Sequence, residues 1–127
     1  MISPEELNSH KYPTTPEIDS NLAILLERIN KVRMIWGKPM IVTSGLRSEV
    51  QQQGLIAQGK SKATKSNHLI GAAVDIQDLD GSLAKWTHDN QSLMEQIGLW
   101  MEDTNSTHGW VHYQIYPPKS GNRFFIP

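Results

Sequence analysis

Three residues of types that bind metal ions stand out in the sequence. The stretch "SNHLIGAAVDIQD", residues 66–78, contains His68 and, seven residues later, Asp75, in an apolar run where valine or isoleucine would pack better. A second histidine, His112, lies in "WVHYQI" near the end of the chain. Burying a carboxylate without a partner is costly, so we expect a positive group beside Asp75.

The segments that carry Asp75 and His112 are expected to be strands. Side chains alternate between the two faces of a strand, so Asp75 points away from its apolar neighbours. In the later strand the same rule places Trp110, His112 and Gln114 on one face. If the two strands are neighbours, Asp75 and His112 can lie with their Cβ atoms about 5 Å apart, and His68 can complete a set of three.

Two histidines and one carboxylate form a ligand set that suits Zn²⁺. Three protein ligands leave the fourth position open, which is typical of catalytic rather than structural zinc. The chain has no cysteine, which excludes disulfides and thiolate zinc sites. Two alternatives stay open from the residues alone. Each histidine can be an ordinary hydrogen-bonded residue of its segment, and Asp75 can simply end an edge strand.

Helical and strand patterns are mixed along the chain. The clearest element is a helix that begins at Pro16 with Thr15 as its cap, because apolar residues then recur at spacings of four and three. A second helix is expected between Ser48 as its cap and Gly59 as its stop, and a third over Leu83–Ile97. Strands are expected at Met40–Thr43, 72–78, 109–116 and 123–127, and a loop at 61–67.

The length of 127 residues fits one domain, 1–127, in which residues 1–14 form a polar N-terminal arm with a short helical turn. The mixture of elements predicts an α+β fold, with helices packed on a small, mostly antiparallel sheet. A net charge of −1 gives no electrostatic footprint for nucleic acid. No apolar run approaches the roughly 20 residues of a membrane span, and the N-terminus lacks a secretory signal. We therefore expect a soluble protein made in a cytoplasm without a signal peptide.

Taken together, "TSGLRS", "SNHLIGAAVDI" and "GWVHYQ" resemble the motifs of the zinc peptidases that act on D-alanyl-D-alanine and L-alanyl-D-glutamate bonds of bacterial cell walls. The pattern of that family has Ser-x-His, then Gly and Ala, then Asp seven residues after the His, and a late Trp-x-His. All of these appear here in that order. The resemblance implies the small α+β fold also seen in the amino-terminal signalling domain of hedgehog proteins. Many members of the family are phage lysins or phage structural components.

The resemblance also implies roles for individual residues. His68, Asp75 and His112 would hold Zn²⁺, which activates water and polarises the scissile carbonyl. Arg47 matches an arginine near the carbonyl or carboxylate of the substrate, where a guanidinium can bind an oxyanion. Without the resemblance, Arg47 is equally well interpreted as a surface arginine after a turn. Ser66 is a weaker match on the substrate side, since a serine two residues before a ligand can simply shape the loop.

The general base is where the sequence departs from the family pattern. Many relatives carry Glu or Asp three residues before the last histidine, and this chain has Gly109 there. The nearest acids are Glu102 and Asp103, and a reversing loop between two strands can return either of them to the metal. The sequence does not choose between them. His108 competes with both, because some relatives place an extra histidine shortly before the last ligand, although it can also be a polar loop residue.

These observations leave three hypotheses. The first is a zinc-dependent peptidase, either a carboxypeptidase or an endopeptidase, that hydrolyses a D-Ala-D-Ala or L-Ala-D-Glu type bond in the peptide stems of peptidoglycan. The second is a non-catalytic zinc-binding module for cell-wall binding or phage assembly, suggested by the missing acid at position 109. The third is a metal-free structural domain, which requires the three ligands to lie apart. For the first, we expect a monomer that acts on the bacterial cell wall and is phage-encoded or virion-associated.

Overall fold

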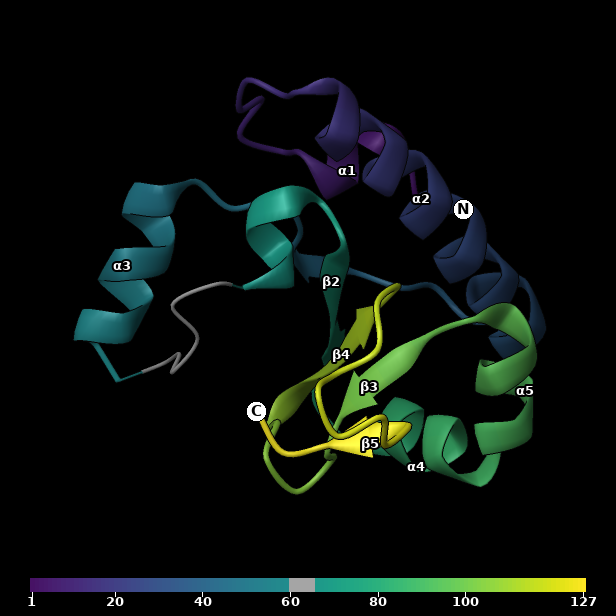
Figure 1. Ribbon diagram of the computed structural model, residues 1–127. Coiled ribbons are helices and arrows are strands. Elements are labelled where there is room, and N and C mark those ends of the chain that lie inside the picture. The colour runs from purple at the N-terminus through teal and green to yellow at the C-terminus, as the bar shows by residue number, and fades with distance from the viewer. Residues whose placement is uncertain (60–65) are drawn as a thin grey trace.

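The computed structural model of the protein describes residues 1–59 and 66–127. The longest element is helix α2, Pro16–Trp36 (Figure 1). The hydroxyl of Thr15 accepts the backbone N–H of Ile18 at 3.2 Å, so Thr15 caps the helix as predicted. Gly37 ends it in the left-handed conformation, with a φ of 78° that glycine adopts without steric cost.

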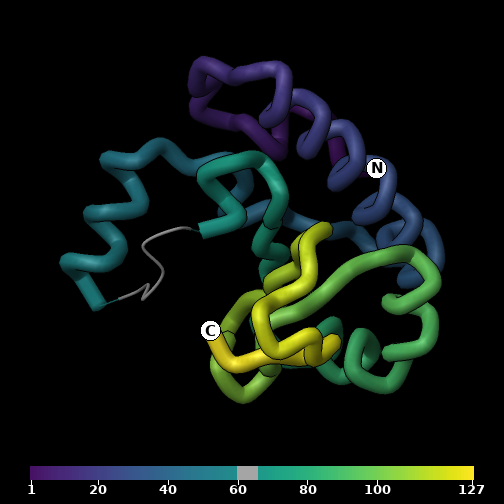
Figure 2. The backbone as a smooth tube through the Cα atoms, in the orientation of Figure 1, coloured from purple at the N-terminus to yellow at the C-terminus, as the bar shows by residue number. Residues whose placement is uncertain are grey.

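A five-stranded sheet lies beside α2, with the strand order β1-β2-β4-β3-β5. The strands are Val42–Ser44 (β1), Ala73–Asp78 (β2), Trp100–Glu102 (β3), Gly109–Gln114 (β4) and Phe124–Phe125 (β5). The first four strands pair antiparallel, and β5 joins β3 in parallel. Figure 2 shows the C-terminal segment, in yellow, folding back to this pairing. The predicted α+β fold with a mostly antiparallel sheet is confirmed.

The two central strands, β2 and β4, give the sheet one apolar and one polar face. The two strands are neighbours, and their register places Asp75 opposite His112, the arrangement that was expected if they paired. The alternate residues are fully buried in a core that includes Leu25, Ile29 and Val32 of α2. On β2 and β4 these core residues are Val74, Ile76, Val111 and Tyr113. The opposite face of the sheet therefore carries the polar side chains.

Shorter helices complete the fold. They are α1 (Pro4–Leu7), α3 (Glu49–Ala57), the 3₁₀ helix η1 (Asn67–Ile70), α4 (Ser82–Asp89) and α5 (Gln91–Ile97). Ser48 caps α3 as predicted, by accepting the backbone N–H of Gln51 at 3.1 Å. Most of the loop predicted at 61–67 lies outside the described residues. In the described chain, no helix is both long and apolar enough to cross a membrane.

The single helix predicted over Leu83–Ile97 is wrong, because the chain breaks between α4 and α5. Asn90 lies at the break with a non-helical φ of −114° and ψ of 38°. Its side-chain amide donates to the carbonyl of Trp86 at 2.7 Å, and its backbone N–H bonds to Thr87. Asparagine competes with helical hydrogen bonding in this way, which ends the first helix and starts the second.

The N-terminal residues are more closely packed than a polar arm. The predicted helical turn is present as α1, but Ile2 and Leu7 are buried in the hydrophobic core. The side chain of Asn30 in α2 also exchanges hydrogen bonds of 2.8 and 3.0 Å with the backbone of Ile2. The buried side chains of Ile2 and Leu7, together with these hydrogen bonds, therefore hold the N-terminal segment against α2.

Candidate metal centre

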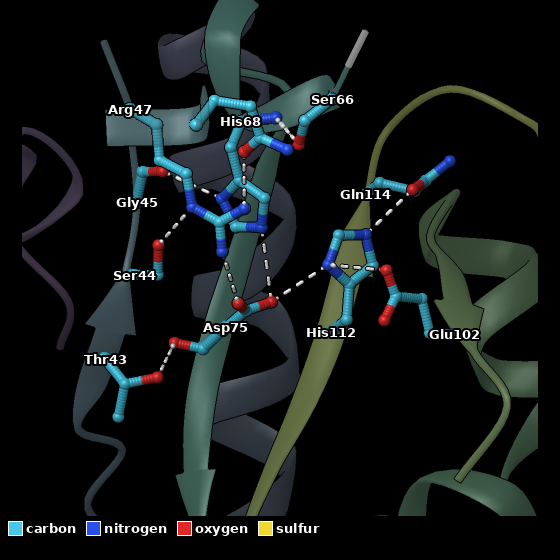
Figure 3. A network of polar contacts seen from close by, with 11 residues as sticks. Thr43, Ser44, Gly45, Arg47, Ser66, His68, Asp75, Glu102, His112 and Gln114 are labelled. Carbon is cyan, nitrogen blue, oxygen red and sulfur yellow. Dashed lines mark hydrogen bonds and ion pairs between the residues drawn. The ribbon is translucent and has the colours of Figure 1, made fainter. Parts of the chain in front are cut away.

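The three predicted metal ligands come together on the polar face of the sheet. Oδ1 of Asp75 lies 3.3 Å from Nε2 of His68 and 2.9 Å from Nδ1 of His112 (Figure 3). The three ligand atoms, one from each residue, all lie within 4.8 Å of one another. All three side chains are buried. The separation of these residues that the third hypothesis required is therefore not found.

The segments around β1 and η1 fix His68. Its ring Nδ1 lies 2.8 Å from the carbonyl oxygen of Gly45, directly after β1. A carbonyl only accepts, so Nδ1 carries the hydrogen and Nε2 is left as the ligand atom. A Cβ at position 45 would overlap the carbonyl oxygen of Leu7, so this approach of α1 to the turn requires glycine. The N-terminal segment thereby helps to position Gly45, whose carbonyl holds the ring of His68.

Asp75 is held from both sides of its carboxylate. Its Oδ2 accepts from Nη2 of Arg47 at 3.2 Å, while Oδ1 faces the two histidines. Burial by itself works to raise the pKa of Asp75, but the charges and hydrogen bonds of His68 and His112 outweigh it and lower the pKa. The positive groups expected beside this aspartate are thus present, and the carboxylate stays ionised.

His112 is bonded through both ring nitrogens. Nδ1 faces Asp75, and Nε2 lies 2.8 Å from Oε1 of Gln114. Burial lowers the pKa of His112, but the hydrogen bond and charge of Asp75, with a further contribution from Glu102, raise it above its ordinary value. In the absence of a metal ion, the ring is therefore suited to carry a positive charge against Asp75.

The structure separates the three candidate general bases. Oε1 of Glu102, at the end of β3, lies 3.7 Å from Nδ1 of His112, and its side chain is 20% exposed. Asp103 follows β3, and its backbone forms hydrogen bonds with Phe125 and Ser106. His108 is exposed in the loop before β4. Of the three candidates, Glu102 is the one with a contact to a predicted ligand, His112.

The two residues predicted on the substrate side lie close to the ligands but are engaged by the protein. Arg47 donates from Nε to Ser44 at 2.9 Å and from Nη2 to Asp75 (Figure 3). Its Nη1 donates to Gln52 at 3.0 Å. The hydroxyl of Ser66 accepts a hydrogen bond from the backbone N–H of His68 at 3.1 Å. Ser66 thereby caps the start of η1. Arg47 is therefore no ordinary surface residue, and Ser66 shapes the segment that carries His68.

Sequence reasoning missed the groups that orient the ligands. Gly45 and Gln114 bond the ring nitrogens of His68 and His112 that face away from Asp75. The position of Gln114 was visible in the sequence, because it shares the strand face of His112 at a spacing of two. The position of Gly45 carried no such signal, since it depends on how β1 packs beside η1.

The donor set fits Zn²⁺. Bonds of 2.0–2.1 Å in a tetrahedron place ligand atoms about 3.3 Å apart, close to the 3.3 and 2.9 Å between Asp75 Oδ1 and the two ring nitrogens. Nitrogen and carboxylate oxygen are ligands that zinc prefers. Three such side chains converge in the described part of the chain, which leaves a coordination position for water or substrate.

Comparisons with known proteins agree with this site. No curated protein matches the chain. The fold is similar to that in the crystal structure of the L-Ala D-Glu endopeptidase ChiX from Serratia marcescens, with a TM-score of 0.56 and 20% sequence identity over 91% of this chain and 99% of that chain. The Peptidase M15 family matches residues 1–112, a span that includes all three candidate ligands. The chain therefore belongs to the Peptidase M15 family.

Proposed function

We propose that this protein is a zinc-dependent peptidase that hydrolyses a peptide bond in the stem peptides of bacterial peptidoglycan. The observation that carries the proposal is the convergence of His68, Asp75 and His112, with an acid beside them. Membership of the Peptidase M15 family supports the same chemistry. A bound Zn²⁺ would lower the pKa of water and polarise the carbonyl of the scissile bond.

Glu102 is our proposed general base. It is the acid closest to the ligands, and its partly exposed carboxylate can accept a proton from water and pass it to the leaving amine. It comes from β3 and so takes the place of the acid that position 109 lacks. The exposed position of His108 and the backbone contacts of Asp103 give neither residue comparable support.

Arg47 has two proposed tasks. Its hydrogen bond to Oδ2 of Asp75 leaves Oδ1 directed at the two histidines. The same partly exposed guanidinium brings a fixed positive charge to the edge of the site, where it can stabilise an oxyanion that develops on the substrate. For Ser66, the hydrogen bond to His68 supports a role in positioning that ligand rather than in contacting substrate.

The bond that is cleaved is best assigned by analysing products. Zinc-loaded protein is incubated with peptidoglycan, and released fragments are identified by mass spectrometry beside an Asp75→Asn variant, which keeps the shape of the side chain but loses its charge. We expect fragments from the native protein alone, and their masses distinguish a D-Ala-D-Ala bond from an L-Ala-D-Glu bond. ChiX is an L-Ala D-Glu endopeptidase, so substrates with that bond belong in the assay.

The same experiment tests the competing hypothesis of a non-catalytic wall-binding or phage assembly module. That hypothesis predicts bound zinc and association with peptidoglycan but no fragments. Release of fragments that is insensitive to chelation would contradict the zinc-dependent mechanism. A role in phage lysis or in a virion is our proposed biological setting, and it rests on the motif resemblance described above.

A further inference from the structure

Gln114 is a buried polar residue at the end of β4 that the proposed reaction does not use. It is 3% exposed, and both polar atoms of its side chain are bonded. Oε1 lies 2.8 Å from Nε2 of His112, and Nε2 donates to the backbone carbonyl of Tyr116 at 2.7 Å (Figure 3 shows its contact with His112). A buried glutamine on the polar face of the sheet, directly against a metal ligand, calls for an explanation.

The direction of these hydrogen bonds follows from the carbonyl of Tyr116. A carbonyl only accepts, so the amide nitrogen of Gln114 must face it and the amide oxygen must face His112. An amide oxygen also only accepts, so Nε2 of His112 must carry a hydrogen. In the neutral ring this leaves the lone pair on Nδ1, the nitrogen that faces Asp75.

The acceptor is itself anchored to the rest of the domain. The hydroxyl of Tyr116 donates to Oδ1 of Asn21 at 2.6 Å, and Nδ2 of Asn21 donates to the carbonyl of Ile70 at 2.9 Å. Asn21 is buried in α2, and Ile70 ends η1, the helix that contains His68. The chain of hydrogen bonds thus joins the segments of both histidines through α2.

The two histidines consequently present opposite ring nitrogens. The carbonyl of Gly45 holds the hydrogen on Nδ1 of His68, and the amide of Gln114 holds it on Nε2 of His112. In its neutral form, each ring therefore turns toward Asp75 the nitrogen that its outer partner leaves without a hydrogen, and this is the nitrogen that can bind a metal ion. Orientation of this kind is what outer partners supply to metal-binding histidines.

We propose that Gln114 is a positioning residue that fixes His112 in the Nε2–H tautomer and so assigns Nδ1 as its metal-binding atom. This inference rests on the proposed zinc site. Removal of an outer partner typically weakens metal binding about 10- to 100-fold. Gln114→Met, which keeps the length of the side chain but replaces the amide oxygen with a weakly accepting thioether, should therefore bind Zn²⁺ more weakly by about that factor.

The experiment compares zinc dissociation constants, measured by competition with a chromogenic chelator, for the native protein, Gln114→Met, Gln114→Glu and Gln77→Met. Gln77→Met is the matched control, because it removes an amide from the same face of the neighbouring strand, opposite Trp110. It should bind zinc within about twofold of the native protein. Gln114→Glu keeps an oxygen acceptor for Nε2–H, so it should bind zinc more tightly than Gln114→Met.

A second readout does not depend on any variant folding. Long-range ¹H–¹⁵N spectra of the zinc-loaded native protein should report a protonated Nε2 and a metal-bound Nδ1 for His112. The inference is overturned by the reverse assignment, or by equal zinc affinities for the native protein and Gln114→Met. If the native protein bound no zinc at all, the proposed function would fail along with it, whereas tight native binding with an unaffected Gln114→Met would refute the inference alone.

Discussion

Asp75 is a negatively charged residue that contacts Arg47 and both histidines of the site. It is 7% exposed and lies between the fully buried Val74 and Ile76, yet it contacts Arg47 on one oxygen and two histidines on the other. A buried carboxylate is tolerated when it is paired and hydrogen-bonded in this way. The same contacts determine how the metal-free protein should respond to pH.

We expect the metal-free protein to lose stability as the pH rises above neutrality. The raised pKa of His112 contributes stability that is fully present below the unfolded pKa, about 6.5, and is lost as the pH rises through the folded pKa. The lowered pKa of Asp75 contributes stability that is present above its unfolded value of about 3.9 and is lost as the pH falls through the folded pKa.

Urea unfolding of the chelated protein at pH 5.5 and pH 8 measures this dependence. The free energy of unfolding should be higher at pH 5.5, where both groups are charged. Asp75→Asn should flatten the difference, because it removes the charge that raises the pKa of His112. A metal-free protein that is more stable at pH 8 than at pH 5.5 would contradict the assignment of charges.

Glu102→Gln tests the proposed base. The amide keeps the size of the side chain but accepts no proton, so hydrolysis should fall about 10²- to 10⁴-fold while zinc affinity changes little. Asp103→Asn is the matched control, and its activity should stay near that of the native protein. Turnover of peptidoglycan fragments and zinc binding are measured on the same samples. Full activity in Glu102→Gln would rule out this role.

At the scale of elements, the turn after β1 connects the N-terminal segment to a ligand. The backbone N–H of Leu46 donates to the carbonyl of Leu7 at 2.7 Å, and the neighbouring Gly45 accepts from His68. The pairing of β1 with β2 is also irregular between Val42 and Ser44, next to Asp75. Irregularities of this type change the direction of side chains near functional sites.

Gly45→Ala should damage both the fold and the site. The added Cβ would overlap the carbonyl of Leu7, and relieving such overpacking typically costs about 1–3 kcal/mol of stability. Any shift of the turn also moves the carbonyl that holds His68, so zinc affinity should fall. Both quantities are measured by chemical unfolding and chelator competition.

Gly54→Ala is the control for this substitution. Position 54 lies inside α3 with nothing within 4 Å of the added Cβ, so alanine should stabilise the protein by about 0.5–1 kcal/mol and leave zinc affinity unchanged. If Gly45→Ala behaved like Gly54→Ala, the close approach of α1 to the turn would not matter for the site.

Elements with a strong local pattern were predictable. Helix α2 follows from its cap and apolar spacing, and the alternation of side chains correctly placed Asp75 and His112 on the polar faces of β2 and β4, where they could meet if the strands paired. The break at Asn90 was missed, because an asparagine inside a helical pattern is tolerated in many helices. The position of Glu102 depends on the register of β3 against β4, in which Met101 lies opposite Tyr113. The sequence does not fix this register, and so it did not distinguish Glu102 from Asp103.

At the scale of the whole molecule, the site is assembled from segments that only the folded chain brings together. His68 comes from η1, Asp75 from β2 and His112 from β4, and the sheet joins the latter two across 37 residues. The unfolded chain does not hold these ligands together, so a metal ion that binds them should stabilise the folded state.

Zinc should therefore raise the thermal stability of the native protein. At a free zinc concentration 100 times the dissociation constant, the gain is about 2.7 kcal/mol for one site. Calorimetric scans at several zinc concentrations measure the shift in Tm. Asp75→Asn should show a much smaller shift, and an equal shift in both proteins would indicate that zinc binds elsewhere.

The most direct test of the central claim is a titration of the metal-free protein with Zn²⁺, in which zinc occupancy and the release of peptidoglycan fragments are followed together. A zinc peptidase with the site described here should show activity that rises in proportion to occupancy and stops rising at one zinc per chain. Fragment release by the metal-free protein at the same rate, or no release at full occupancy, would contradict the account.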